Sequence, residues 1–328
     1  MPPSIPRDSN SPRPFEIRRL ADISAQPNEQ RWLIDPLWLQ SGVGILGGPP
    51  KACKTYLAAE LALAVATGKP ALGQFEVYRP GPVLFYGAED SLPALRARFD
   101  GLAGVRAVSI HNLSIYMLDA PLVRLNRLQD VSRLRAAIEQ CQPRLLVLDP
   151  FIRIAQVDEN SAGEVSAVLA SLREIQREYD LAVLVVHHAR KSPAALPVQA
   201  FRGSSDFAAW SDSNLFLSRN KHHLTLYLEH RSAPAPNPFR LRLEPEPAPH
   251  LLLLDQDQPA TNISIGDPHP LQTEILDLLS AACRPLPTVE IRRLACKRKE
   301  DVVEALFALK SNRHITRTSR GWLLDLPD

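Results

Sequence analysis

A lysine and a hydroxyl residue, Lys54-Thr55, follow the glycine- and proline-rich stretch Gly48-Pro49-Pro50-Lys51-Ala52-Cys53. An apolar run at 44–46 precedes this stretch, and a helix-like run at 56–66 follows it. A strand, a glycine-rich turn, Lys-Thr and a helix form a phosphate-binding loop, because backbone N–H groups and the helix N-terminus converge on one anion. In such a loop Lys54 reaches the β- and γ-phosphates of a nucleotide, and the Thr55 hydroxyl binds Mg²⁺.

One position departs from this pattern. The motif G-x-x-x-x-G-K-[ST] has a second glycine where this chain has Cys53. Either the loop accepts a small side chain there or the match is accidental, and an inactive loop would leave nucleotide affinity unchanged in Lys54→Ala. A side chain at Cys53 could crowd the β-phosphate, so we expect Cys53→Gly to keep or raise the rate of nucleotide hydrolysis.

Further polar residues follow apolar runs typical of buried parallel strands. Glu89 comes after the run 81–88, Asp149 directly follows 145–148, and His187-His188 end the run 181–188. Because ligands of doubly wound sheets sit at the carboxyl ends of the strands, we expect Lys54, Glu89, Asp149 and His188 to meet at one edge.

Each of these residues also has a simpler interpretation. Glu89 could cap the helix predicted from Leu92, since Glu89-Asp90-Ser91 is a typical helix start. The two histidines could be an ordinary polar strand end or a metal pair, although no carboxylate or cysteine stands at a useful spacing. We expect Arg96 and Arg98 to lie on a solvated helix face.

The remaining pattern predicts an α/β doubly wound domain. Helices are expected at 92–102, 128–141 and 165–179, and a further strand at 108–118. Alternating runs at 214–218, 224–229 and 239–243, with a fourth at 251–254, indicate antiparallel strands added at one edge of the sheet.

The 328 residues, of which 45% are hydrophobic, suggest about two domains. Residues 1–30 are expected to be disordered or to lead into the first domain at 31–255, and a linker at 256–269 precedes the second domain. In 270–328, three predicted helices and a hairpin indicate a winged-helix-like domain.

The charge of this tail favours DNA. Between Glu290 and Arg320 there are nine Lys/Arg and four acidic residues. A winged helix with this balance could place its third helix in a major groove, with Arg317 and Arg320 on phosphate or in the minor groove. Winged helices can also dock proteins, which stays an alternative.

Composition excludes several classes of protein. A net charge of +2 argues against a polycation that coats nucleic acid as a whole, so DNA contacts must be local. The four cysteines form no C-x-x-C pair, which argues against a zinc site or a disulfide framework. No apolar stretch approaches the ~20 residues of a membrane span. We therefore expect a soluble cytoplasmic protein.

Taken together, these motifs resemble the RepA-like RecA-fold ATPases, hexameric replicative helicases of plasmids and their relatives in phages and mobile elements. The resemblance covers roughly 30–250 and rests on residues 32–34, the loop, Gly87-Ala88-Glu89-Asp90, Leu148-Asp149-Pro150, His187-His188 and Arg202-Gly203-Ser204. It implies a RecA-like P-loop core with antiparallel edge strands that uses ATP and Mg²⁺.

The resemblance also assigns roles. Lys54 and Thr55 match the nucleotide and Mg²⁺ ligands, Glu89 the general base, Asp149 the Walker B carboxylate, and His188 or His187 a polar sensor beside the γ-phosphate. The family forms rings in which an arginine of the neighbouring subunit completes each site. Related ring helicases carry it in a Lys-x-Arg pattern. Here Glu229-His230-Arg231 stands there without the lysine; Arg231 is the candidate, and Arg219 and Arg202 compete with it.

The stretch after His188 is the candidate DNA-binding loop. Arg190, Lys191 and Arg202 in it could hold single-stranded DNA in the channel of a homo-oligomeric ring, which the resemblance implies to be hexameric. The predicted function is thus a DNA helicase or translocase of a plasmid, phage or mobile element. The alternative is a non-translocating, ATP-dependent regulator or loader whose winged helix selects the DNA site or a partner protein.

Overall fold

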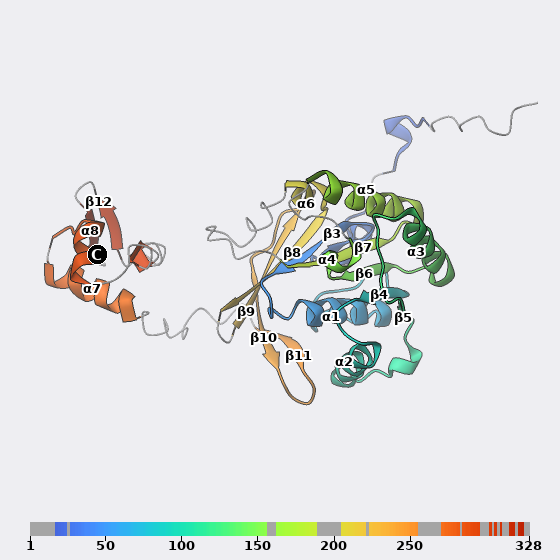
Figure 1. Cartoon of the computed structure of the whole chain (residues 1–328), viewed down its shortest axis with the longest axis horizontal. Helices are drawn as coiled ribbons and strands as arrows, with labels where there is room; N and C mark the ends of the chain where they lie inside the picture. The colour runs from blue at the N-terminus through green and yellow to red at the C-terminus, as the bar shows by residue number, and fades with distance from the viewer. Residues whose placement is uncertain are drawn as a thin grey trace, which may run out of the picture. The chain divides into compact units, whose positions relative to one another are not determined.

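The computed structural model divides the chain into two compact units, Met1–Asp255 and Gln256–Asp328, which are described separately (Figure 1). The residues it describes are 17–24, 27–155, 162–188, 205–220, 223–254, 270–282, 284–295, 302–303, 305–306, 309, 315–318 and 321–324. Within this part of the chain, we find no helix with the length and apolar character needed to cross a membrane.

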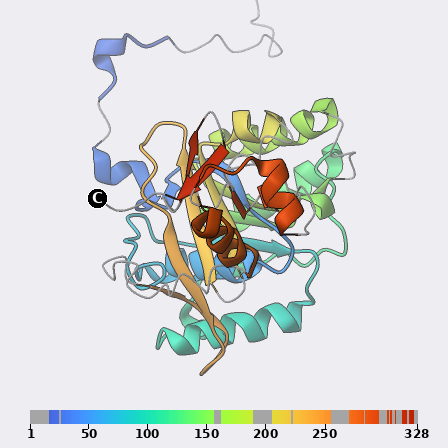
Figure 2. The ribbon, with the colours of Figure 1, turned by 90° about the vertical axis from the view of Figure 1, so that its left-hand side faces the viewer.

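A nine-stranded sheet forms the centre of the first unit, in the order β11-β10-β9-β8-β3-β7-β6-β4-β5. Its parallel strands are β3 (Val43–Gly48), β4 (Val83–Gly87), β5 (Ile115–Met117), β6 (Leu145–Asp149), β7 (Ala182–His188) and β8 (Ser213–Asn220). The antiparallel strands are β9 (His223–His230), β10 (Phe239–Glu244) and β11 (His250–Leu253), which can be followed in yellow and orange in Figure 2.

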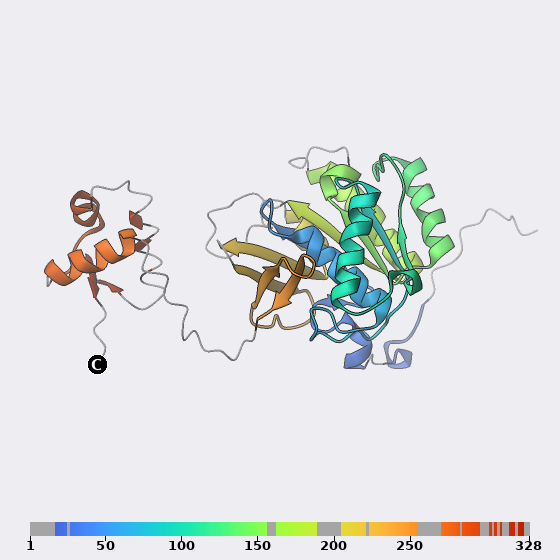
Figure 3. The same cartoon turned by 90° about the horizontal axis from the view of Figure 1, so that it is seen from below.

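Helices cover both faces of this sheet, as the doubly wound prediction requires. One face carries α1 (Lys54–Thr67) and α2 (Leu92–Val105), which lie in front of the sheet in Figure 3. The other face carries α3 (Leu128–Cys141), α4 (Phe151–Ile154), α5 (Ala162–Tyr179) and α6 (Ser205–Trp210). The short elements are η1 (Leu20–Asp22), η2 (Asn28–Arg31), η3 (Ile110–Asn112) and the strand pair β1 (Trp32–Ile34) and β2 (Trp38–Leu39).

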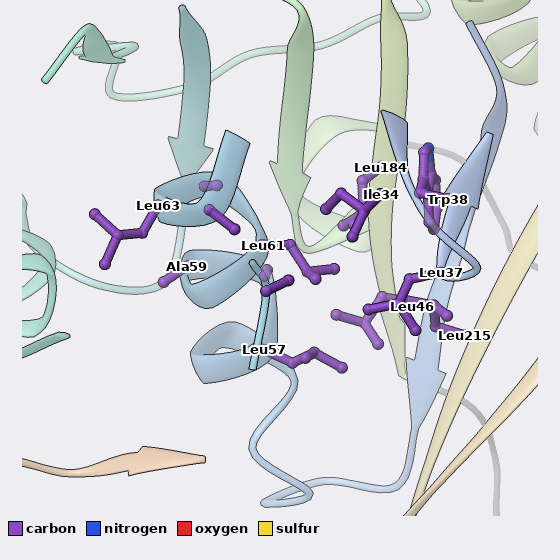
Figure 4. Close-up of a cluster of buried hydrophobic side chains, with 14 of the residues drawn as sticks. Ile34, Leu37, Trp38, Leu46, Leu57, Ala59, Leu61, Leu63, Leu184 and Leu215 are labelled. Carbon is purple, nitrogen blue, oxygen red and sulfur yellow. The ribbon is translucent and has the colours of Figure 1, made fainter. Parts of the chain in front are cut away.

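The P-loop helix α1 is buried almost all round because its sequence is nearly continuous in alanine and leucine. In Figure 4, Leu57 and Leu61 point toward the strands, where Leu46 and Leu184 lie. Burying a leucine side chain in this way stabilises the fold by roughly 1.5–3 kcal/mol. The packing therefore fixes the start of α1, and with it Lys54, against the end of β3.

Two expectations need correction. The predicted strand at 108–118 is a strand only at Ile115–Met117, with η3 before it. The strand predicted at 214–218 is β8, which pairs in parallel with β3 and antiparallel with β9, so antiparallel pairing begins one strand later. Polar residues interrupt β8 because they bond inward: Ser213 accepts a hydrogen bond from Leu39 N, and Asn214 from Ile45 N.

The second unit has its own core. Its helices are α7 (Pro270–Ala282) and α8 (Thr288–Leu294), and residues 302–303, 305–306 and 309 are also helical. Strands β12 (Ile315–Thr318) and β13 (Gly321–Leu324) form a hairpin, and Leu286 bridges to Trp322 beside it. This arrangement agrees with the elements predicted for the tail, and the winged helix itself stays a prediction.

Candidate active site

The loop between β3 and α1 adopts a backbone that favours glycine. Cys53, the N-cap of α1, has φ 62° and ψ 26°, and Lys51 has φ 63°. Holding a side-chain-bearing residue in this left-handed region costs roughly 1–3 kcal/mol. Cys53 thus replaces the second glycine of the motif at a position where the backbone still has the left-handed conformation that favours glycine.

Lys54 is folded over this loop. Its Nζ donates hydrogen bonds to the carbonyls of Gly48 and Pro49, each at 2.9 Å, and the residue is 5% exposed. Burial lowers the pKa of Lys54, while the nearby carboxylates of Asp149 and Glu89 raise it. The first N–H groups of α1 have no acceptor within the helix, and they lie in the same turn as the Lys54 residue.

Asp149 ends β6 in a buried position, 6% exposed. Burial raises its pKa to about 6, against a hydrogen bond from the Thr55 hydroxyl that lowers it. A hydroxyl and a carboxylate in contact are oxygen ligands that suit Mg²⁺, which is held by one or two carboxylates together with substrate phosphates. In chemical terms Thr55 and Asp149 therefore fit this ion.

Glu89 follows β4 and lies between the guanidinium of Arg153 and the ring of His188, whose pKa is lowered by burial. Its Oε1 lies 3.5 Å from Arg153 Nε, and its Oε2 lies 3.8 Å from His188 Nε2. The helix-cap interpretation of Glu89 is wrong, because Ser91 is the N-cap of α2 and accepts from Ala94 N. Glu89 is left at the carboxyl edge of the sheet, half-exposed.

The two histidines at the end of β7 face different surroundings. The ring of His187 lies 4.7 Å from that of Phe207 and 6.1 Å from that of Phe151, and burial lowers its pKa to about 4. His188 lies at the cavity, and its Nδ1 is buried without a hydrogen-bond partner among the described residues. Within that part of the chain no cluster of three His, Cys, Asp or Glu is arranged to hold a metal.

These residues meet at a cavity of about 320 Å³, within the size range of small-ligand sites. Sheet order explains the meeting: β7 lies between β3 and β6, and β4 follows β6, so the loop, His188, Asp149 and Glu89 come from adjacent strand ends. The lining residues are Lys51, Ala52, Cys53, Lys54, Thr55, Tyr56, Gly87, Glu89, Asp90, Arg98, Asp149 and His188.

The expectation that Arg98 lies on a solvated face is wrong. Arg98 lines the cavity, donates to Asp90 at 2.6 Å and lies 4.8 Å over the ring of Tyr56. Its position between the buried residues Leu95 and Phe99, on the apolar stripe of α2, was the available signal. Arg96 lies on the exposed face as expected, paired with Asp100.

Arg153, which sequence reasoning also missed, follows Asp149 by four residues in α4, and no motif marks it. Arg219 lies beside the phosphate-binding loop and donates to the Lys51 carbonyl at 2.7 Å.

The other predicted residues are not among the described residues that line the cavity. Arg231 follows β9 at the edge where β3 begins, opposite Lys54, and contacts Ala209 O and Asp212. Arg317 belongs to the second unit, where its guanidinium lies 5.6 Å over the Trp322 ring. Arg190, Lys191, Arg202 and Arg320 lie outside the residues that the structure describes.

Comparisons with known proteins concern the family and the fold of the first unit. A family model described as an AAA domain, AAA_25, matches residues 11–194, just over half of the chain. A solved structure described as an ATPase domain superposes with a TM-score of 0.51 at 14% identity, over 66% of this chain and 86% of that one. A DnaB-like replicative helicase solved for its interactions with primase (TM-score 0.47, 14% identity, 66% and 58% covered) and the RadB recombinase (0.46, 16%, 62% and 88%) superpose less well. The order of the parallel and antiparallel strands and the match to the ATPase domain show that the core has a RecA-like α/β fold.

Proposed function

This chain belongs to the AAA domain family, and we propose that it binds ATP with Mg²⁺ and hydrolyses it, as a ring-forming RecA-fold ATPase acting on DNA. One observation carries the proposal. Lys54, Thr55, Asp149, Glu89 and His188, from four different strand ends, meet at a single cavity. Phosphoryl transfer requires little more than such positioning of charge and an in-line water.

The loop would bind the phosphates. Lys54 exchanges its hydrogen bonds to Gly48 O and Pro49 O for contacts to the β- and γ-phosphates, which offer it a full negative charge. The N–H groups at the start of α1 add partial positive charge. Mg²⁺, held by Thr55 and Asp149, supplies further neutralisation of the charge on the transferred group.

Glu89 is the group that would take a proton from the attacking water. It is at the cavity, half-exposed, and held between Arg153 and His188 rather than engaged in a helix cap. His188, which lines the cavity and lies 3.8 Å from Glu89, is the candidate for sensing the γ-phosphate.

The DNA-related part of the proposal rests on the motif resemblance and on the basic tail. It comprises a RepA-like ring, single-stranded DNA on Arg190, Lys191 and Arg202, and duplex contacts by Arg317 and Arg320. For the arginine supplied to a neighbouring subunit, Arg231 is the candidate from the family pattern. Its guanidinium contacts Ala209 O and Asp212 within its own chain and would have to leave them.

The test compares wild type, Lys54→Ala and Glu89→Gln in nucleotide binding and steady-state ATPase assays. We expect Lys54→Ala to lose binding and Glu89→Gln to keep binding while turnover falls at least ~100-fold. Lys69→Ala removes an exposed lysine just past the far end of α1 and serves as the matched control. Unchanged affinity in Lys54→Ala would show that the loop is inactive.

DNA dependence is measured separately. Single-stranded DNA should raise the ATPase rate, a forked duplex should be unwound, and mass photometry with ATP should show a ring. An ATPase rate that does not change with DNA would favour the regulator or loader. A protein that stays monomeric with ATP would exclude an arginine supplied by a neighbouring subunit.

A further inference from the structure

Two residues of the phosphate-binding loop are strained in the same way. Lys51 and Cys53 both carry side chains and both have φ near +60°. Such conformations persist only where the surrounding structure enforces them. Something outside the loop must therefore hold it, because the loop's own sequence favours relaxation.

Strand β8 is the neighbour of β3, the strand that leads into the loop. It pairs in parallel with β3 up to Gly47, opposite Phe216. At Gly48 the backbones come so close that a Cβ would stand 2.4 Å from the Leu217 carbonyl oxygen, so only glycine fits. The next side chain on the same strand to reach the loop is that of Arg219.

Arg219 fixes one peptide plane of the loop. Its Nη1 donates to the Lys51 carbonyl at 2.7 Å, while the N–H of Ala52 in the same peptide donates to Pro49 O at 3.3 Å. The peptide between Lys51 and Ala52 is thus held at both ends. Because it separates the two strained residues, holding it sets how the chain enters Cys53 and the first turn of α1.

We propose that Arg219 is a positioning residue that clamps the phosphate-binding loop in its left-handed, nucleotide-binding conformation. A glycine at position 53 would adopt this conformation with less strain and would need the clamp less. Successive residues in alternating right- and left-handed conformations turn their N–H groups to one side and form an anion-binding concavity. Without the clamp, Lys51 and Cys53 relax and this concavity opens. The inference rests on the proposed function for the identity of the ligand, and on the loop geometry for the clamp.

The role differs in a measurable way from that of an arginine supplied to a neighbouring subunit. A clamp acts before chemistry, so its loss weakens nucleotide binding and leaves turnover at saturation. An arginine on the transferred phosphate stabilises the transition state, so its loss lowers kcat. Cys53→Gly should make the clamp less important, because glycine takes this left-handed conformation without strain and only Lys51 stays strained.

The experiment measures ADP affinity by calorimetry, and ATPase kcat and KM, for Arg219→Ala, Arg219→Lys, Cys53→Gly and the double variant. Arg219→Ala should weaken ADP binding about 10-fold, with kcat within about twofold, and Arg219→Lys should restore part of the affinity. In the Cys53→Gly background, Arg219→Ala should weaken ADP affinity by a smaller factor than it does in the wild-type background. Arg240→Ala removes an exposed arginine from β10 of the same sheet and should change nothing.

A second readout needs no nucleotide. Cys53→Gly should raise Tm in the wild-type background and raise it less when Arg219 is alanine, because the loop has then already relaxed. Lower kcat with unchanged ADP affinity, or equal effects of Arg219→Ala in both backgrounds, would overturn the clamp. If wild type binds no nucleotide, the proposed function fails, whereas the Tm comparison still decides on the clamp.

Discussion

Lys54 and Asp149 are oppositely charged, buried side chains at one cavity, and burial shifts the pKa of each toward its neutral form. Such a site favours a ligand that carries both negative and positive charge, as a nucleotide with a bound cation does. A phosphate group compensates the ammonium, and a divalent cation compensates the carboxylate. Perturbed pKa values of this kind cluster at functional sites.

The pKa of Asp149, raised to about 6, predicts a pH dependence of cation-assisted binding. Protonated Asp149 cannot hold Mg²⁺, so affinity for Mg·ADP should fall roughly 10-fold between about pH 7 and 5. For the protein without ligand the sign is opposite: the stability that protonated Asp149 contributes is present below the ordinary aspartate pKa of 3.8 and is lost as pH rises through about 6.

Calorimetric titrations with Mg·ADP across this range provide the measurement. The same titrations in EDTA report the protonation of the nucleotide itself and are subtracted. Asp149→Asn should bind Mg·ADP weakly with the pH dependence removed. An equal pH dependence in wild type and Asp149→Asn would assign the titration to another group.

Arg98 provides a second prediction for a single residue. Without it the Asp90 carboxylate loses its 2.6 Å partner and adds unbalanced negative charge to a cavity that already holds Glu89 and Asp149. Because a hydrogen bond to a charged group contributes about 1.5–3 kcal/mol, Arg98→Ala should weaken ADP binding roughly 10-fold or more. Arg96→Ala, two residues away on the exposed face, should bind as wild type does, and equal losses in both variants would contradict this role.

Among the elements, helices α1 and α2 are tied together far from the cavity. Glu60 of α1, 5% exposed, accepts hydrogen bonds from Arg106 Nε at 3.2 Å, from Arg106 Nη2, and from Leu72 N at 2.7 Å. Arg106 Nη2 also donates to Pro70 O at 2.9 Å. A buried charge pair with this many hydrogen bonds fixes how α2, and with it Arg98, sits against the P-loop helix.

Breaking this pair should destabilise the first unit by about 3–5 kcal/mol, because Glu60→Ala leaves the Arg106 guanidinium buried without its carboxylate. Asp100→Ala breaks the exposed Arg96–Asp100 pair and should cost less than about 1 kcal/mol. Urea unfolding measures both. Well-packed apolar residues often replace a buried ion pair without loss of stability. The double variant Glu60→Leu with Arg106→Leu should therefore recover most of the stability lost in Glu60→Ala. Similar losses of stability in Glu60→Ala and Asp100→Ala would contradict the role of the Glu60–Arg106 pair.

Much of the element pattern could be predicted from sequence, for physical reasons that these elements show. Buried parallel strands such as β6 and β7 are continuous apolar runs, so their polar ends, Asp149 and His188, stand out. The pairing of β8 was harder to predict because the direction of pairing depends on the connection between strands. Its buried polar residues Ser213 and Asn214 also give it the sequence pattern of an exposed edge strand. Contacts between distant segments, such as Arg98 with Tyr56, leave only an ambiguous sequence signal.

At the scale of the whole molecule, the two units have separate hydrophobic cores. The first unit has one cluster on each face of its sheet, and the cluster of the second contains only residues from Leu271 to Trp322. A unit with its own core can unfold by itself. The proposed catalytic groups all belong to the first unit, whereas the basic tail belongs to the second, so ATP turnover and tail-dependent DNA binding should be separable by mutation.

Ile275→Ala in α7 tests this separation in the full-length chain. Ile275 is 0% exposed, so the change should cost about 2–5 kcal/mol and lower the Tm of a small second unit by roughly 10 °C or more. Scanning calorimetry should show two transitions, of which saturating Mg·ADP raises only that of the first unit, since a ligand stabilises the unit that binds it. Leu294→Ala, at a 46% exposed position of α8, is the matched control and should leave both transitions in place.

DNA-independent ATPase activity should be unchanged in Ile275→Ala, while duplex DNA binding should weaken above the temperature at which the second unit melts. A parallel loss of ATPase activity at that temperature would mean that the second unit supports the catalytic unit directly, and that the chain works as one body.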